Sequence, residues 1–172
     1  MITEELTPYK ERVTPQEIYT YQRKVESLQY AAVITRFNIA RTALKLAEFS
    51  QNPSPKHHGA VDRAISYLYG TKTLAIEYSA ATNSHRVFVA ASDAAFADDI
   101  ATRKNTVGYL FQLFGGVIDW HLLRQKTVTT SSTEAELLAL THAAKETYWW
   151  KRFFQSITLD AGHELAVVCD NL

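Results

Sequence analysis

Three acidic residues stand at positions from which they could act together. Two apolar segments each end in an aspartate, residues 86–93 at Asp93 and residues 165–170 at Asp170. We expect both segments to be strands. If they are parallel neighbours in one sheet, both carboxylates emerge at the same carboxyl edge, where open α/β sheets place their ligands. The third acid, Glu136, lies in the first turns of a long predicted helix whose apolar face should pack on that sheet.

Converging carboxylates repel one another, and a glutamate on an apolar face is costly if it stays ionised without a partner. A divalent cation removes this repulsion, and hard oxygen ligands suit Mg²⁺ or Mn²⁺. Two such ions about 4 Å apart can clamp a scissile phosphate, activate a water and stabilise the leaving oxygen. The three acids therefore indicate metal-dependent hydrolysis of phosphodiesters.

Each acid also has an ordinary structural interpretation. An aspartate at the end of a strand often forms a turn or caps a helix. A glutamate in a first helical turn is favoured by the helix dipole. The residues alone leave these interpretations open, and only the combination of two strand ends with one helix start favours a site.

The elements that must position these acids form the second half of the chain. We expect, in order, strands at residues 86–93, 107–114 and 117–121, a helix at 132–156 capped by Ser131, and a strand at 165–170. A turn at residues 115–116 would join the second and third strands. Three meandering strands, followed by a helix that crosses to a strand beside the first, make a mixed sheet with a helix on one face.

The first half has a helical pattern. Helices are predicted at residues 15–34, 38–50 and 56–69, followed by a short strand and a polar join at 71–83. Thr14, Pro15 and Glu17 are typical of a helix start, and Asn38 is expected to cap the second helix. The expected buried stripe of the first helix consists of Val25, Leu28, Gln29 and Ala32.

Composition bounds the function classes. The chain has 18 basic and 18 acidic residues, and neutrality argues mildly against tight nucleic-acid binding by this chain alone. A single cysteine, Cys169, permits no internal disulfide and favours an intracellular compartment. No apolar stretch approaches the ~20 residues that span a bilayer, so we expect no membrane association. The aromatic run at 148–154 could stack on bases, but Trp149 and Phe153 are expected to face the core.

Several ordered motifs resemble copia-type retrotransposon polyproteins. The second half carries SDAAFADD at 92–99, TRK at 102–104, GGVIDW at 115–120 and CDN at 169–171, and the sharpest match is SSTEAE at 131–136. Upstream, Tyr21, Ser27 and Tyr30 resemble the end of the family's reverse transcriptase, and residues 52–71 resemble the segment joining it to the ribonuclease H domain. The resemblance covers roughly residues 18–172.

The resemblance implies a reverse transcriptase connection segment at 1–83 and a ribonuclease H-like domain at 84–172. It also implies that two Mg²⁺ (or Mn²⁺) ions support cleavage of the RNA strand of RNA–DNA hybrids. The family's acidic metal ligands correspond to Asp93, Glu136 and Asp170. The basic residues Arg103, Lys104 and Arg124 could contact phosphates. The implied partners are the hybrid and the rest of the polyprotein, in a cytoplasmic virus-like particle or the nucleus.

The chain also departs from the family pattern. The family's fourth acidic ligand lies beyond Leu172, so we expect an incomplete ribonuclease H-like domain. Bases are common in the family where this chain has Gly59, Asp62, Ser66 and Tyr69. Losing them would weaken phosphate contacts. The alternative expectation is therefore a catalytically inactive retroelement remnant that acts as a structural or nucleic-acid-binding module.

Overall fold

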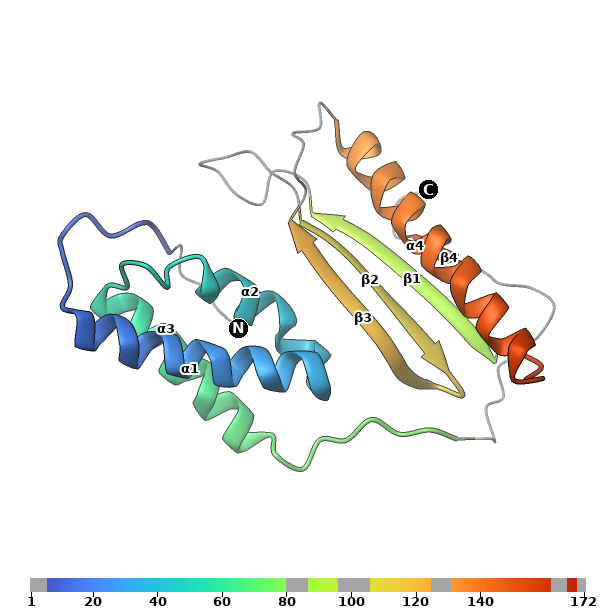
Figure 1. Ribbon diagram of the computed structural model, residues 1–172, viewed down its shortest axis with the longest axis horizontal. Helices are drawn as coiled ribbons and strands as arrows, with labels where there is room; N and C mark the ends of the chain where they lie inside the picture. The colour runs from blue at the N-terminus through green and yellow to red at the C-terminus, as the bar shows by residue number, and fades with distance from the viewer. Residues whose placement is uncertain (1–5, 80–86, 96–105, 125–130, 162–166, 170–172) are drawn as a thin grey trace. The chain divides into compact units, whose positions relative to one another are not determined.

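The computed structural model describes residues 6–79, 87–95, 106–124, 131–161 and 167–169. The chain divides into two compact units, Met1–Ala75 and Ile76–Leu172. The first is helical, and the second combines a sheet with one long helix (Figure 1). No helix among the described residues is long and apolar enough to cross a membrane.

The first unit contains helix α1 (Pro15–Ile34), the 3-10 helix η1 (Phe37–Ile39), α2 (Ala40–Ala47) and α3 (Pro55–Gly70). The predicted start of α1 is confirmed, because Thr14 and Glu17 form a reciprocal capping box with Pro15 at the first helical position. The second helix is shorter than predicted. After Ala47 the chain turns with i→i−3 hydrogen bonds instead of continuing the helix.

Two expectations for this unit are wrong. Asn38 does not cap α2, because it lies within η1 and its side chain instead bonds to Arg36 and to the Tyr67 hydroxyl. Residues 71–79, where a short strand was expected, contain no strand, and the rest of that range lies outside the described residues. The chain here forms a turn after α3, which Arg36 holds by donating to the Thr71 carbonyl and hydroxyl.

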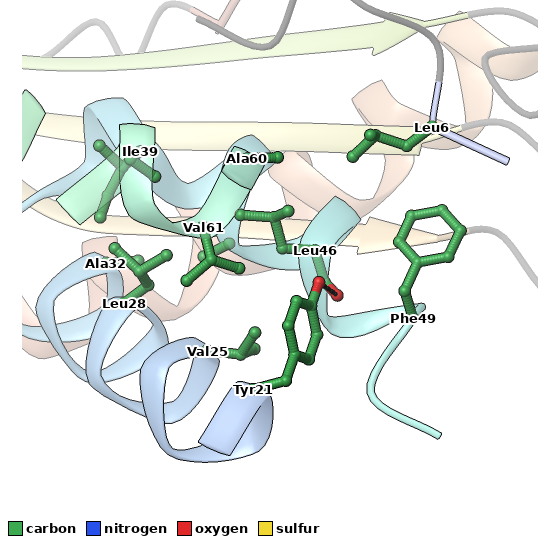
Figure 2. Packing of buried hydrophobic residues seen from close by; sticks show 12 residues of the cluster. Leu6, Tyr21, Val25, Leu28, Ala32, Ile39, Leu46, Phe49, Ala60 and Val61 are labelled. Carbon is green, nitrogen blue, oxygen red and sulfur yellow. Dashed lines mark hydrogen bonds between the residues drawn. The ribbon is translucent and has the colours of Figure 1, made fainter. Parts of the chain in front are cut away.

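The helices of the first unit enclose their own core (Figure 2). The predicted stripe on α1 is confirmed at Val25, Leu28 and Ala32, but Gln29 is exposed and Tyr21 takes its place. Tyr21 is fully buried, and its hydroxyl donates to the Leu46 carbonyl at 2.8 Å. This bond satisfies the buried phenol, whose pKa is raised by burial. The core also includes Ile39, Ala43 and Leu46 from η1 and α2, and Ala60, Val61 and Ala64 from α3.

His57 joins three parts of the first unit. It is only 1% exposed, and its ring stacks on Phe49 with 4.0 Å between the ring centroids. His57 Nδ1 accepts a hydrogen bond from the Ser54 N–H at 2.9 Å, which completes the capping box of α3, and the ring also bonds to the backbone of Thr7. A ring nitrogen accepts a hydrogen bond only when it is unprotonated, so this arrangement requires neutral histidine.

The second unit contains a four-stranded sheet in the order β3-β2-β1-β4. The strands are β1 (Phe88–Ala95), β2 (Thr106–Leu113), β3 (Gly116–Arg124) and β4 (Val167–Cys169), and α4 (Ser132–Ser156) precedes β4. The strands β1, β2 and β3 form an antiparallel meander, while β4 pairs parallel with β1. The expected mixed sheet and its order are therefore confirmed, although β1 begins and ends two residues later than predicted and β3 runs further than predicted.

Helix α4 begins and ends where the sequence predicts, and Ser131 caps it by accepting from the Glu134 N–H at 3.1 Å. Its N-terminal half contacts the sheet through Ala135, Ala139 and Ala143, which are buried and small enough to allow a close approach. Further along, Trp150 and Phe154 pack with Phe88 and Phe111 of the sheet. This aromatic cluster forms the core of the second unit.

The hairpin between β2 and β3 differs by one residue from the prediction. Phe114 and Gly115 form the turn, with φ values of 52° and 80°, and Gly116 begins β3. Tyr78 lies against this turn, and its hydroxyl donates to the Val117 carbonyl at 2.9 Å. A methyl group on Gly116 would lie 2.7 Å from the Glu77 carbonyl oxygen and closer still to the Tyr78 ring.

Burial is the main cause that lowers the pKa of His57, and this predicts a pH-dependent stability of the helical unit. The contribution of neutral His57 to stability is fully present above the pKa of about 6.5 that histidine has in the unfolded chain. It is lost as the pH falls through the lower pKa of His57 in the folded chain. For the wild type, the temperature midpoint of unfolding should decrease as the pH is lowered from neutral to about 5. His57→Gln keeps an acceptor for the cap without titrating, so its midpoint should change less over this range.

The control is His142→Gln, which replaces an exposed histidine on α4. It should keep the pH dependence of the wild type. Equal slopes for the wild type and His57→Gln would contradict a neutral structural role for His57.

Gly116→Ala should destabilise the second unit by about 1–3 kcal/mol, because the added methyl displaces backbone at residue 77 as well as a side chain. Chemical denaturation followed by circular dichroism would measure this loss. Gly108→Ala is the matched control, since its methyl would meet the end of the Leu122 side chain at 3.1 Å and the nearest backbone atom, the His121 carbonyl oxygen, at an ordinary contact distance of 3.8 Å. A Gly116→Ala loss no larger than the Gly108→Ala loss would show that residues 76–79 do not pack on the hairpin.

Candidate functional site

The two aspartate-ending segments lie side by side as the sequence predicts. Strand β1 pairs parallel with β4, and Ser92 is the partner of Cys169 in the register. In the sequence, each of these two residues is followed by an aspartate, Asp93 after Ser92 and Asp170 after Cys169. Asp93 lies within β1, is exposed, and has Gly108 of β2 as its antiparallel partner. Asp170 lies outside the described residues.

The start of α4 lies at the same end of the second unit as the carboxyl end of β1, because the helix runs back along that strand (Figure 1). Glu136 occupies the first turns of α4 next to buried Ala135. Its own side chain is only half-buried, so it stands at the margin of the packed face and not under it as expected. A position at the margin reduces the desolvation cost of a charged carboxylate.

The alternation of side chains along β1 determines on which face of the sheet Asp93 lies relative to Glu136. Phe88, Ala90 and Ser92 are buried on the face that packs on α4. Successive side chains of a strand point to opposite faces, so Asp93 belongs to the other face of the sheet. The structure therefore brings Asp93 and Glu136 to one end of the unit and presents them from different sides. Among the described residues, no group of three histidine, cysteine or acidic side chains is close enough to hold a metal ion.

The predicted phosphate-contacting bases are described only in part. Arg103 and Lys104 lie outside the described residues. Arg124 is the last residue of β3 and is the partner of Thr106, which in turn pairs with Ala95 at the end of β1. The backbone of Arg124 is thus at the same end of the sheet as Asp93.

Tyr109 of β2 lies next to this end, opposite Ser92 of β1. Its ring stacks with His121 of β3 at 5.7 Å between centroids. Burial, assisted by the negative charges of Glu146 and Asp119, raises the pKa of the Tyr109 phenol. Tyr109 therefore stays protonated at neutral pH and can donate a hydrogen bond.

The expectation that Trp149 and Phe153 face the core is wrong. They are 54% and 40% exposed, while Trp150 and Phe154, one residue further, pack on the sheet. The buried stripe of α4 continues from Ala143 through Thr147 to Trp150 and Phe154. Following the helical period from the alanines would have found this phase.

Comparisons with known proteins place the chain among retroelement sequences. It is 38% identical over 129 residues to the "Secreted RxLR effector protein 161" of Plasmopara viticola, an alignment covering 75% of this chain and 89% of the effector. It is 39% identical over 151 residues to the "Retrovirus-related Pol polyprotein from transposon TNT 1-94" of Nicotiana tabacum. It is 31% identical over 161 residues to the corresponding polyprotein from transposon RE2 of Arabidopsis thaliana.

These alignments cover 88% of this chain for both polyproteins, but only 11% and 10% of the polyproteins themselves. The effector and the TNT 1-94 polyprotein each match so much of this chain that both must match many of the same residues. No family model matches the chain. No solved structure matches it either.

Proposed function

We propose that this chain is a retroelement-derived ribonuclease. It belongs to the same sequence family as the effector of Plasmopara viticola and the retrovirus-related Pol polyproteins of transposons. In this proposal, residues 84–172 form a ribonuclease H-like domain that hydrolyses the RNA strand of RNA–DNA hybrids. Residues 1–83 correspond to the end of the reverse transcriptase and its connection to that domain.

One observation carries the proposal. The parallel pairing of Ser92 with Cys169 makes β1 and β4 neighbours, and in the sequence an acid follows each of these two residues. A helix start that bears Glu136 reaches the same end of the unit. Acids contributed by two adjacent strand ends and one helix start are suited to phosphate chemistry with divalent cations.

The donor chemistry of Asp93, Glu136 and Asp170 fits Mg²⁺ or Mn²⁺, since all three offer carboxylate oxygens. Asp93 is exposed and Glu136 half-buried, so both remain accessible to a hydrated ion. Two bound ions would supply the charge that activates water and stabilises the leaving oxygen.

The chain's own basic side chains would orient the substrate. Arg124 ends β3 at the same end of the sheet as the carboxyl end of β1, with β2 between the two strands, and Arg103 and Lys104 follow β1 in the sequence. Their role in this proposal is to contact phosphates, while groups that bond to the 2′-hydroxyl distinguish RNA from DNA. The proposed partners are the hybrid and the remainder of a reverse transcriptase polyprotein, in a cytoplasmic particle or in the nucleus.

Cleavage of a labelled RNA–DNA hybrid with Mg²⁺ or Mn²⁺ tests the proposal. Asp93→Asn and Glu136→Gln should each lower the cleavage rate by at least about 100-fold, because even an outer-shell partner of a metal site is worth roughly 10- to 100-fold. Glu134→Gln is the matched control, since Glu134 is exposed, lies two residues from Glu136 and therefore points to a different side of α4. Equal loss in Glu134→Gln and Glu136→Gln would remove Glu136 from the ligand set.

A second candidate function is a non-catalytic binding module. The effector of Plasmopara viticola matches this chain over 89% of its own length, so almost all of the effector consists of sequence similar to this chain. Two further features favour a role other than tight hybrid binding: the formal net charge of zero, and the lack of basic residues at positions 59, 62, 66 and 69, which are Gly59, Asp62, Ser66 and Tyr69.

Hybrid affinity measured against salt concentration separates the two candidates when combined with cleavage. For the non-catalytic module we expect a shallow slope of log K against log salt and no cleavage, because few phosphates are neutralised. Metal-dependent cleavage that Asp93→Asn abolishes would instead exclude the module. A steep salt slope would contradict the loss of phosphate contacts.

A further inference from the structure

The outward face of the C-terminal half of α4 carries exposed aromatic rings between basic residues. Trp149 and Phe153 lie one helical turn apart, and their rings are parallel within 3° with 5.5 Å between centroids. Both rings stand almost perpendicular to Trp150, at 84° each, with centroid distances of 5.0 Å and 5.7 Å. Trp150 is itself held by Phe88 and Phe154 of the core. The pair is therefore fixed in orientation before anything binds.

The charges on this face are positive. Lys145 precedes Trp149 by four residues and Arg152 follows it by three, so both share its side of the helix. Both are exposed, as is Lys151. Glu146 is the acid of this half of α4; it precedes Trp149 by three residues and borders this face on the flank toward the sheet, where its charge acts on Tyr109. This half of the helix thus presents flat π surfaces with three basic residues, Lys145, Lys151 and Arg152, against one acid.

We propose that Trp149 and Phe153, flanked by Lys145 and Arg152, form a stacking site for unpaired bases of single-stranded nucleic acid. Aromatic rings stack on any base, and flanking cations attract the phosphates that follow it. A protein partner for an aromatic helix face would need a matching apolar groove and acids to meet the cations. A single strand supplies both chemistries in every nucleotide, namely a π face and an anion.

This site is separate from the carboxylate end of the sheet. Trp149 lies thirteen residues after Glu136. At 1.5 Å and 100° per residue, that is roughly 20 Å along α4 and on nearly the opposite side of the helix. Binding at this site therefore does not depend on the proposed hydrolysis. In a chain that does cleave hybrids, the site would hold a single strand that leaves the duplex.

Binding of fluorescent single strands to the full chain tests the inference. The probes are oligothymidylate and oligouridylate of about 12 nucleotides, within the length that small binding domains cover. Wild-type chain should bind both, and its tryptophan fluorescence should be quenched as a base stacks on Trp149. Trp149→Ala should raise the Kd by roughly 5- to 150-fold, the range for losing one base–aromatic stack. Trp149→Phe keeps a ring and should raise it less.

The matched control is Leu137→Ala, which removes a similarly exposed apolar side chain from the same helix but lies near its start. It should bind like wild type, and binding measured without divalent cations separates this site from the catalytic proposal. Lys145→Gln with Arg152→Gln should flatten the salt dependence of binding.

Equal affinity of Trp149→Ala and wild type would overturn the inference, provided that circular dichroism shows both to be folded. So would a Trp149→Ala loss of affinity that is larger for the duplex hybrid than for either single strand. Sedimentation gives the remaining outcome: a dimer that Trp149→Ala dissociates, with no binding of single strands, would assign this face to a second copy of the chain and overturn the proposal.

Discussion

The parallel pairing of β1 with β4 is the constraint on which the second unit depends. The three strands before it form an antiparallel meander, which short turns can connect. A parallel neighbour for β1 instead requires the chain to return along the sheet before it enters β4. Helix α4 makes this return, and its direction follows from it. The helix must begin near the carboxyl end of β1, and for this reason an acid in its first turns shares an end with Asp93.

The two ends of α4 meet different packing requirements. Near its start, Ala135, Ala139 and Ala143 let the helix approach the sheet closely, which leaves Glu136 at the margin of the contact. Further along, larger side chains fill the space between helix and sheet. Because consecutive residues are about 100° apart on a helix, the aromatic residues between 148 and 154 cannot all face the core. Tyr148, Trp149 and Phe153 are exposed, while Trp150 and Phe154 pack on the sheet.

The helical unit has its own core and its own polar constraint. Its buried side chains come from all of its helices, and neutral His57 connects α3 to Phe49 and to the chain before α1.

The sequence by itself determined the helices and most of the strand order, because local signals decide them. The capping residues Thr14 and Ser131 mark helix starts, and apolar alternation marks strands. The sequence also predicts Asp93, Glu136 and Asp170 as a set, which stays a prediction because Asp170 lies outside the described residues. Only the tertiary structure decided on which face each side chain lies. A shift of one residue in a strand, or of 100° in a helix, reverses what is buried without changing the local pattern.

That ambiguity explains the particular differences. The sequence predicts an acid at the end of β1, but pairing with β2 places Ser92 toward the helix and Asp93 on the other face. The sequence predicts an aromatic stripe on α4, but packing on Phe88 selects Trp150 and Phe154 and leaves Trp149 and Phe153 exposed. Likewise, Asn38 can cap a helix in principle, yet its side-chain oxygen accepts from Arg36 Nε and its amide nitrogen donates to the hydroxyl of Tyr67. For β1 and α4, a partner remote in sequence decides between local alternatives of similar free energy.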